Sequence, residues 1–493
     1  MLAKERELDQ ISAREDKLNR LKELGIEPYP YSYDPTHSTV DVRANFDALE
    51  GSTVKVAGRL VAIRLHGKSC FAHIKDREGK LQVYFKFDVL GERGYNVVKL
   101  LDLGDWIGVE GEVFKTRTGE ITILVHELSL LSKCLRPLPE KWHGLKDVEL
   151  RSRRRYLDLI VNEFALAVFR KRTAVVKALR RVLDERGFIE VETPILQPIY
   201  GGAFARPFVT HHNTLDIDLY LRISNELYLK RLIVGGLERV YEIGKDFRNE
   251  GMDRLHNPEF TQLEVYQAYA DYNDMMDLCE ELVRASAVSA NGSARVEYEG
   301  MVLDFDKPWK RLSFYDGLER ALGVDFSKIE DEEELKVKAK EVAKDMELEE
   351  GMTRGKILDE LFSTYVQRDL KEPTFVVDYP VELSPLAKRH RSNPSLVERF
   401  EPVVMGVEIG NAYSELNDPA DQRERFLYQQ RLREMGDGEA QPIDEDFLMA
   451  LEYGMPPTGG LGVGVDRLVM LLTGVTSIRE VILFPQMRPE GGG

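Results

Sequence analysis

The sequence predicts an α+β fold with two parts, a small β-barrel near the N-terminus and a larger domain whose antiparallel sheet is flanked by helices. Three patterns support this prediction. Short segments of alternating apolar and polar residues fill the region from 53 to 131. Apolar residues recur at helical spacing from 163 to 186. Beyond that helix, strands and helices mix without the regular alternation that predicts a parallel sheet.

The composition is typical of a globular protein with more than one core. The chain has 493 residues, of which 43% are hydrophobic and 31% charged, and a net charge of −17. Its three cysteines lie far apart, so we expect a reducing compartment, the cytoplasm. No apolar run approaches the roughly 20 residues that cross a bilayer, and the charged start does not resemble a signal peptide. We therefore expect no membrane partner.

The barrel strands are expected between clear turn signals. They are predicted at residues 54–56, 70–74, 81–85, 106–114 and 121–125. Five short strands in this span favour an OB-fold, which commonly binds single-stranded nucleic acid. Residues 51–135 also carry a small basic excess within an acidic chain, which suits RNA binding at one face. A generic barrel without a ligand remains an alternative.

Helix and linker signals divide the rest of the chain. An exposed amphipathic helix is expected at 3–24, ended by Gly25. Clusters of proline and arginine between 136 and 155 indicate a linker. We therefore expect an N-terminal helical extension (1–50), the barrel (51–135), the linker (136–155) and the larger domain (156–493). The acidic stretch 329–351 predicts a solvated helix or an insertion.

The most informative segment is a predicted hairpin at residues 241–266. Strand-like pieces at 241–247 and 260–266 flank a polar turn. The polar side chains in or beside this turn include Arg248, Glu250, His256 and Asn257. A plain hairpin, the alternative, needs none of them, whereas a site for a polyanion on the face of an antiparallel sheet would use all four.

A glycine-rich strand at 459–464 runs into an apolar helix near the C-terminus. Its spacing does not match the dinucleotide-binding fingerprint. The glycines instead allow a ligand to lie close to the strand, with Arg467 reaching it from the start of the helix. Tight packing of strand against helix, with a surface arginine, is the alternative.

Two acids are candidates for a metal site. Glu401 and Glu408 lie seven positions apart on two strand-like pieces. Both carboxylates could hold Mg²⁺ through oxygen, with water and phosphate as its other ligands. Two half-buried acids of an edge strand are the alternative.

Three further acids, Glu226, Glu264 and Glu415, have apolar or aromatic neighbours. Glu226 is expected in the first turn of a helix, where an acid is ordinary. Taken singly, each of the three is expected at the surface.

Together these segments resemble the three motifs of class II aminoacyl-tRNA synthetases. Residues 163–194 are similar to motif 1, 247–264 to motif 2 and 459–472 to motif 3. Within the class, the chain resembles the bacterial-type lysyl-tRNA synthetases from its N-terminal helix to about Pro489. The segments that carry this resemblance are Arg136-Pro-Leu-Pro, Arg155-Tyr-Leu-Asp-Leu-Ile, Gly201-Gly-Ala, His256-Asn-Pro-Glu-Phe, Ala268-Tyr-Ala-Asp-Tyr and Asn411-Ala-Tyr-Ser-Glu-Leu-Asn-Asp-Pro.

The resemblance implies an OB-fold anticodon-binding domain followed by a class II catalytic domain. It implies that the enzyme activates L-lysine with ATP to lysyl-adenylate and pyrophosphate, and then transfers lysine to the 3′ end of tRNA(Lys). It also implies a homodimer, with Mg²⁺ as cofactor and ATP as co-substrate.

The resemblance further implies roles for individual residues. Arg248 and Arg467 would be catalytic. The ATP-binding set would be Arg248, Glu250, His256, Asn257, Phe260, Glu401, Glu408, Ile409 and Arg467, with Glu401 and Glu408 as ligands of Mg²⁺. The lysine-binding set would be Gly202, Glu226, Arg248, Glu264, Tyr266, Asn411, Tyr413, Glu415 and Gly460. The anticodon set would be Arg64, Phe71, Gln82 and Glu120, with Phe71 stacking on a base.

Two departures from the family pattern concern the lysine pocket. Tyr200 stands before Gly201-Gly202, and Ser224-Asn225 precede Glu226, where many relatives have proline and Ala-Pro. These residues could change the shape of the pocket while leaving its charged contacts in place.

Three other functions compete with this interpretation. The first is an aspartyl- or asparaginyl-tRNA synthetase, which shares the layout. The second is the paralogue that attaches a lysine-type group to a translation factor, but it lacks the OB-fold domain. The third is an inactive RNA-binding paralogue, against which the joint presence of Arg248, Glu401, Glu408 and Arg467 argues.

Overall fold

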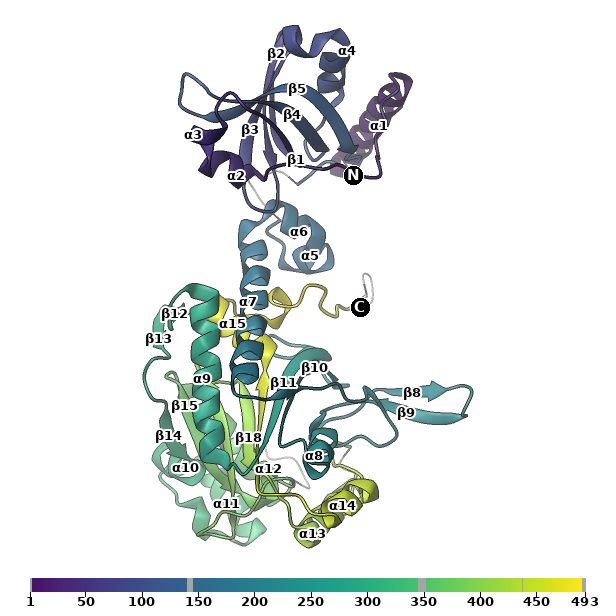
Figure 1. The fold of residues 1–493 in the computed structure, drawn as a ribbon. Helices are drawn as coiled ribbons and strands as arrows, with labels where there is room; N and C mark the ends of the chain where they lie inside the picture. Colours follow the sequence, from purple (N-terminus) through teal and green to yellow (C-terminus); the bar gives the residue numbers. More distant parts are fainter. Residues whose placement is uncertain (1, 140–144, 345–351, 437, 490–493) are drawn as a thin grey trace. The chain divides into compact units, whose positions relative to one another are not determined.

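The computed structural model describes residues 2–139, 145–344, 352–436 and 438–489 (Figure 1). The chain divides into two compact units, Met1–Lys146 and Asp147–Gly493. Among the described helices, none combines the length and the apolar character that a membrane crossing requires.

The first unit is a closed five-stranded barrel with the strand order β1-β2-β3-β5-β4. Its strands are β1 (Thr53–His66), β2 (Ser69–Lys75), β3 (Lys80–Lys86), β4 (Trp106–Lys115) and β5 (Ile121–Ser132). Its helices are α1 (Leu2–Glu23), α2 (Thr39–Ala44), α3 (Phe46–Leu49) and α4 (Phe87–Leu100). The five predicted strands and the N-terminal helix are confirmed.

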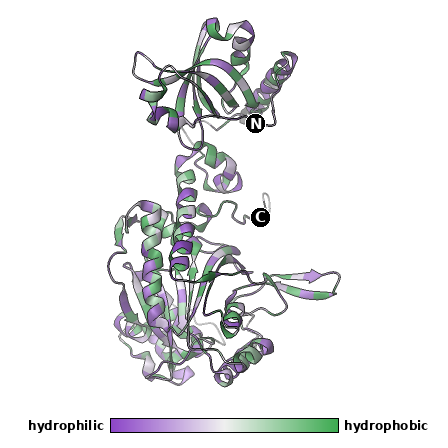
Figure 2. Cartoon of the chain, viewed as in Figure 1, coloured by the Kyte–Doolittle hydropathy of each residue, from purple (hydrophilic) through white to green (hydrophobic). Residues whose placement is uncertain are grey.

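Alternation along the barrel strands separates core from surface, and hydrophobic and hydrophilic residues alternate along them in Figure 2. On β2, Cys70, Ala72 and Ile74 are buried, while Phe71 and His73 between them are partly exposed. Because successive side chains of a strand point to opposite faces, this register places Phe71 on the outer face of the barrel.

The second unit is built on a nine-stranded sheet with the order β14-β15-β16-β18-β19-β11-β10-β6, in which β17 also pairs with β16. Its strands are β6 (Ile189–Glu190), β10 (Arg239–Phe247), β11 (Glu259–Ala268), β14 (Lys310–Ser313), β15 (Thr374–Pro380), β16 (Leu396–Val404), β17 (Val407–Glu408), β18 (Gly410–Ser414) and β19 (Thr458–Gly464). Neighbouring strands are antiparallel except for β6 beside β10 and β14 beside β15. The predicted antiparallel sheet is confirmed, with one parallel pair at each edge.

Helices and two smaller sheets complete this unit. The helices are α5 (Val148–Arg153), α6 (Arg155–Val161), α7 (Glu163–Glu185), α8 (Glu226–Val234), α9 (Tyr272–Asn291), α10 (Phe314–Leu322), α11 (Glu332–Val342), α12 (Arg354–Tyr365), α13 (Pro419–Glu434), α14 (Glu445–Glu452) and α15 (Val465–Thr473). One small sheet has the order β7-β9-β8 and the other pairs β12 with β13. Their strands are β7 (Leu196–Gln197), β8 (Val209–His212), β9 (Ile217–Leu221), β12 (Arg295–Tyr298) and β13 (Met301–Asp304).

The main core lies between the large sheet and the helices α7, α9 and α15, and α7 and α9 run side by side in Figure 1. On the sheet side, β11 contributes Leu263 and Val265 to this core. Glu264 and Tyr266 alternate with them, so they point to the opposite face. The strand thus directs polar side chains away from the helices.

Two predicted segments differ in extent or fall partly outside the described residues. The strand expected at 188–194 shrinks to β6, because only Ile189 and Glu190 pair in register with β10 before the chain turns away toward Pro194. In the acidic stretch, Glu332–Val342 forms the predicted helix, and its four Glu residues are exposed. Residues 345–351 lie outside the described residues.

Candidate active site

A cavity of about 340 Å³ opens on the face of the large sheet that bears Glu264 and Tyr266. Strands β11, β16, β18 and β19 and the first residues of α8 and α15 contribute to its lining. Every residue that the resemblance assigns to ATP or lysine lines this one cavity. Side chains that lie far apart in the sequence therefore share a single site.

The glycines of β19 have different neighbours on the two faces of the sheet. A Cβ atom at Gly460 would overlap the Glu415 carboxylate and lie 2.7 Å from a ring carbon of Tyr266. At Gly459 it would instead meet Met275 of α9 at 3.0 Å. Gly459 thus permits the close helix packing of the alternative expectation, while Gly460 leaves room in the cavity; that a ligand fills this room stays a prediction.

Three carboxylates converge at one end of the cavity. Glu226, Glu264 and Glu415 are only 4%, 5% and 1% exposed. The expectation that each would lie at the surface is therefore wrong. Residues distant in the sequence cover them, which the local pattern around each acid does not show.

Burial raises the pKa of all three carboxyl groups. For Glu264 burial is the largest cause, and the neighbouring carboxylates add to it. Burial also raises the pKa of Glu415 to about 8, against the opposing effect of Lys230. The phenol of Tyr266 donates to Glu264 at 2.9 Å. Such a set of desolvated acids suits a cationic ligand that replaces the lost water.

The sequence interpretation assigned no role to Lys230, which stands behind this cluster. This residue of α8 is completely buried, and its ammonium lies 2.5 Å from Glu226 and in ion-pair contact with Glu415. Its pKa is raised because the effects of the two carboxylates outweigh that of burial. The spacing of Glu226 and Lys230, four apart on a helix, was the available signal.

The sequence interpretation also assigned no role to Arg399 of β16. This residue connects Glu401, one of the two candidate metal ligands, with Asn411 of β18. Its guanidinium donates to Glu401 at 2.5 Å and to the side-chain oxygen of Asn411 at 3.0 Å. It also lies over the ring of Tyr379, whose hydroxyl donates to Glu401 at 2.8 Å. Burial raises the pKa of Glu401 to about 7, with Arg399 opposing and Glu408 adding to the rise.

Gln441 is a third missed residue, close to the predicted lysine-binding Gly202. Its side-chain oxygen accepts from the backbone N–H of Gly202 at 3.0 Å, and the residue is 1% exposed. The positive φ of Gly202 and the nearness of Ser224 leave no room for a side chain there. Gln441 lies before α14, where nothing in the local sequence indicates a pocket residue.

Two arginines and an aromatic ring also line the cavity. The guanidinium of Arg248 lies 5.1 Å from the ring centre of Phe260, and its buried Nε has no hydrogen-bond partner. The backbone N–H of Arg248 donates to Pro258 at 2.9 Å, which closes the hairpin loop. The predicted hairpin is confirmed by the pairing of β10 with β11.

Arg467 reaches the same cavity from the first turn of α15. It donates to the backbone oxygen of Glu408 at 2.8 Å and to Nε2 of His256 at 2.9 Å. The preceding residue, Asp466, fixes this turn by accepting from Arg172 and from the N–H of Thr261 at 2.6 Å. Two guanidinium groups and a ring thus line the same cavity as the three buried acids.

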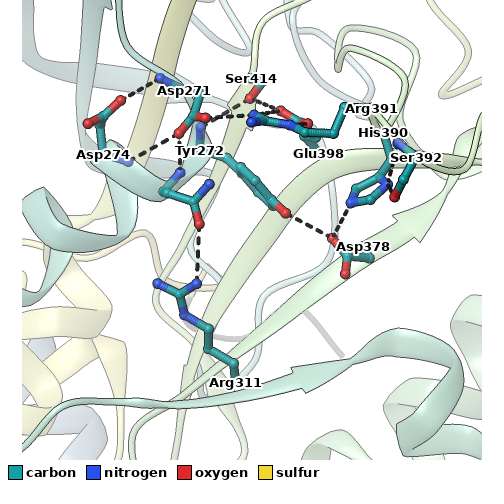
Figure 3. A network of polar contacts seen from close by, with 11 residues as sticks. Asp271, Tyr272, Asp274, Arg311, Asp378, His390, Arg391, Ser392, Glu398 and Ser414 are labelled. Atoms are coloured by element: carbon teal, nitrogen blue, oxygen red, sulfur yellow. Dashed lines mark hydrogen bonds and ion pairs between the residues drawn. The ribbon is translucent and has the colours of Figure 1, made fainter.

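A separate polar network supports the strands from outside the cavity (Figure 3). Arg391 bridges Asp271, the N-cap of α9, and Glu398 of β16. Glu398 accepts from Ser414 at 2.5 Å, and Ser414 in turn accepts from the N–H of Tyr272 at 3.1 Å. The network thereby anchors the end of β18, directly before Glu415.

On the barrel, the residues assigned to the anticodon lie on the outer face. Phe71 stacks on Tyr84 with ring centres 4.3 Å apart and an angle of 13°. Gln82 donates to Glu120 at 2.9 Å, and Arg64 pairs with Phe71 in the register of β1 and β2. The four predicted residues therefore belong to adjoining strands and one loop of the barrel.

The described residues contain no group of three or more histidine, cysteine, aspartate or glutamate side chains that could hold a metal. Glu401 and Glu408 are two oxygen donors near each other, since the charge of Glu408 contributes to the raised pKa of Glu401. Two carboxylates are the number that commonly holds Mg²⁺ together with substrate phosphates.

Comparison with known proteins agrees with this geometry. Residues 147–488 match the family described as tRNA synthetases class II (D, K and N), and residues 54–131 match the OB-fold nucleic acid binding domain. The lysine–tRNA ligase of Thermoanaerobacter pseudethanolicus is 56% identical over 97% of this chain and 96% of its own. That of Moorella thermoacetica is also 56% identical, over 99% of both chains, and that of Clostridium novyi is 55% identical over 97% and 94%. The chain therefore belongs to the class II tRNA synthetases and, within them, to the lysine–tRNA ligase family.

Proposed function

We propose that this chain activates L-lysine with ATP and transfers it to the 3′ end of tRNA(Lys). The observation that carries the proposal is the cavity itself, whose lining includes three buried carboxylates and two arginines. An ammonium group taken out of water needs fixed counter-charge, and the carboxylates supply it. An aspartate substrate would instead place a carboxylate against this end of the cavity, where repulsion would oppose binding.

We assign the amino-acid end to Gly202, Glu226, Glu264, Tyr266, Asn411, Tyr413, Glu415 and Gly460. The ring of Tyr266 and the carboxylates border the space that Gly460 leaves open. Arg248 lines the same cavity, so we assign the carboxylate of lysine to its guanidinium. The assignment is supported by the burial of Glu226, Glu264 and Glu415 together in the lining of one cavity.

We assign the nucleotide end to Arg248, Glu250, His256, Asn257, Phe260, Ile409 and Arg467, together with Glu401 and Glu408. Phe260 would stack on adenine, Arg248 would bind the α-phosphate and Arg467 the γ-phosphate. Arginine suits this task because its planar guanidinium donates to two oxygens at once. The unpartnered Nε of Arg248 supports an anionic ligand there, since a buried donor without an acceptor is costly.

The first reaction needs alignment and charge neutralisation more than acid–base catalysis. An oxygen of the lysine carboxylate forms a bond to the α-phosphorus, and the bond from that phosphorus to the bridging oxygen breaks. Pyrophosphate leaves, and lysyl-adenylate remains. Arg248 would hold the two reacting groups together, and its charge stabilises the oxygens of the transition state. In the second reaction a hydroxyl of the terminal ribose of tRNA attacks the lysyl carbonyl carbon, and AMP leaves.

We propose that Glu401 and Glu408 hold Mg²⁺. The residues fit this ion, because both donors are oxygen and their mutual repulsion would be relieved by a divalent cation. The bound ion would neutralise phosphate charge. Arg399 keeps Glu401 in place through its short hydrogen bond and thus orients one of the two ligands.

We propose that the barrel binds the anticodon of tRNA(Lys) on its outer face. The partly exposed Phe71 is stacked on Tyr84, which holds the Phe71 ring in place so that a base can stack on it. Arg64, Gln82 and Glu120 supply donors and acceptors that can read the edge of an unpaired base.

We also propose that the chain acts as a homodimer in the cytoplasm. Large apolar side chains at the start of α7, on β6 and on β7, namely Phe164, Ile189 and Leu196, are about half exposed. Exposed apolar side chains such as these are typical of surfaces that a second subunit covers. The division into parts at 1–50, 51–135, 136–155 and 156–493 remains our proposal for the domain organisation.

Amino-acid-dependent exchange between ATP and pyrophosphate, measured with each of the twenty amino acids, tests the proposed function. Lysine should stimulate the exchange more than any other amino acid. The proposal fails if lysine does not stimulate exchange or if aspartate or asparagine stimulates it better. Exchange without any transfer of lysine to tRNA would contradict the second step alone.

A further inference from the structure

Lys230 is a buried cation that the proposed reaction does not use. Its side chain is 0% exposed and does not line the cavity, whereas its two ion-pair partners, Glu226 and Glu415, do. The two acids come from the first turn of α8 and from the residue after β18. One ammonium therefore holds two carboxylates that belong to different elements.

The third carboxylate of the cluster has no such partner. Glu264 accepts hydrogen bonds from Tyr266 at 2.9 Å and from Gln262 at 2.7 Å. No lysine or arginine among the described residues forms an ion pair with it. The cluster thus contains three carboxylates and one internal ammonium, which leaves a surplus of two negative charges when all are ionised.

This surplus matches the substrate of the proposed function. L-lysine carries two ammonium groups, and its carboxylate is assigned to Arg248. Lys230 lowers the pKa of both Glu226 and Glu415 against the effect of burial, so without it these acids would hold a proton more tightly. A bound lysine would first have to displace that proton.

A purely structural role for Lys230 predicts a different result of its replacement. If Lys230 only tied α8 to β18, its replacement by an apolar side chain would leave two buried carboxylates without their partner and damage the fold, so the KM values for lysine and ATP would change together. The ammonium of Lys230 forms ion pairs with two carboxylates that line the cavity, so it can change the charge that a bound ligand meets. Within this low-dielectric environment, the interaction is screened less than at the surface.

We propose that Lys230 is a positioning residue for the amino-acid substrate, whose fixed ammonium aims Glu226 and Glu415 at the cavity and adjusts its charge to that of a dibasic amino acid. This inference rests on the proposed function. Other charged or titratable groups near the cluster are Glu264 and Tyr266 of β11, Tyr413 of β18 and Arg399 of β16. The charges of Glu226 and Glu415 act on both tyrosines, but among the described residues Lys230 alone forms ion pairs with both acids.

The test uses the full chain and the variants Lys230→Met and Lys230→Arg in ATP–pyrophosphate exchange. Wild-type exchange with lysine is measured first, because its absence contradicts the proposed function rather than the role of Lys230. For Lys230→Met we expect the KM for lysine to rise about 10- to 100-fold, as for loss of a charged hydrogen bond. The KM for ATP should change less than about twofold, and Lys230→Arg should restore part of the lysine affinity. An unchanged KM for lysine, or equal changes in both KM values, overturns the proposal.

A charge-compensation experiment separates ligand binding from folding. In Glu415→Gln, the ammonium of Lys230 competes with the substrate for the remaining Glu226, so lysine should bind weakly. Adding Lys230→Met to that variant restores the surplus of two negative charges, and we expect the KM for lysine to fall relative to Glu415→Gln alone. A further rise in KM overturns the proposal, because a structural tie predicts additional damage. This comparison remains valid if the single Lys230→Met variant does not fold.

Discussion

Arg467 and His256 are joined by a hydrogen bond of 2.9 Å between the guanidinium and Nε2 of the imidazole. A guanidinium only donates, so Nε2 is the acceptor and the ring proton lies on Nδ1. From there it is donated to Asp253 at 2.8 Å. The bond links the loop of the β10–β11 hairpin to the first turn of α15. If the γ-phosphate of ATP takes the N–H that His256 now accepts, as the proposed role of Arg467 implies, this bond breaks and ATP binding is coupled to the position of the loop.

Replacement of Arg467 by lysine should therefore impair the reaction while leaving the fold intact. Lysine keeps the charge but cannot donate to the Glu408 carbonyl, His256 and a phosphate from one planar group. We expect kcat for ATP–pyrophosphate exchange to fall about 100- to 1000-fold. Arg320→Lys, on the exposed face of α10, serves as the matched control and should keep wild-type exchange. Equal activity of the two variants would contradict the role of Arg467.

The stacked pair Phe71–Tyr84 predicts a separation of the two reactions. Phe71→Ala should leave amino-acid activation unchanged, because the barrel does not contribute to the cavity that we assign to lysine and ATP. Loss of a stacked base should raise the KM for tRNA(Lys) in aminoacylation about 10- to 100-fold. Tyr31→Ala, which removes a fully exposed aromatic residue of the same unit, is the control. Equal losses in exchange and aminoacylation would remove the anticodon assignment.

Local sequence patterns were sufficient to predict the secondary-structure elements that carry the site. The hairpin β10–β11 is specified by two alternating segments around a polar turn, and the end of β19 by the glycines before Arg467. The strand at 188–194 was overestimated because its pairing depends on β10, which lies about 50 residues later in the chain.

The burial of individual charges could not be predicted in the same way. Glu226 and Lys230 have the spacing of an ordinary surface ion pair on a helix, and Glu415 sits after a short strand. Only the tertiary contact between α8 and the end of β18 buries all three together. Arg399 and Glu401 similarly share one face of β16, but the pairing of Arg399 with Asn411 depends on the neighbouring strand. The family resemblance assigned Glu226, Glu264 and Glu415 to the proposed lysine pocket, but it did not indicate Lys230, which holds two of them.

The raised pKa of Glu415 predicts the direction of a pH dependence. Burial raises this pKa to about 8, so below that pH the ligand-free carboxyl group retains its proton. Bound lysine needs the ionised form, while its own side chain stays charged because its ordinary pKa is about 10.4. The KM for lysine should therefore fall as the pH rises from 6.5 to 8.5. The measurement is ATP–pyrophosphate exchange at saturating ATP.

The KM for ATP, measured over the same range, is the internal control for this pH dependence. It should not follow the curve for lysine, because Glu415 lies at the amino-acid end of the cavity. A KM for lysine that is constant or rises with pH would show that Glu415 does not titrate on binding.

Gly460 and Gly459 offer a matched pair of substitutions on the two faces of β19. In Gly460→Ala the added methyl group meets the Glu415 carboxylate and Tyr266, on the side of the proposed lysine pocket. In Gly459→Ala it meets the side chain of Met275 and the backbone oxygen of Asp271, each at 3.0 Å, on the side of α9. Neither glycine has a positive φ, so the two variants differ in what the methyl group touches rather than in backbone strain. We expect the KM for lysine to rise more than about 100-fold only in Gly460→Ala, since overpacking of a filled site costs about 1–3 kcal/mol and displaces the carboxylate as well. Thermal unfolding should show that both variants are folded. If Gly459→Ala raises the KM for lysine more than Gly460→Ala does, the amino acid does not bind on the face of β19 that we propose.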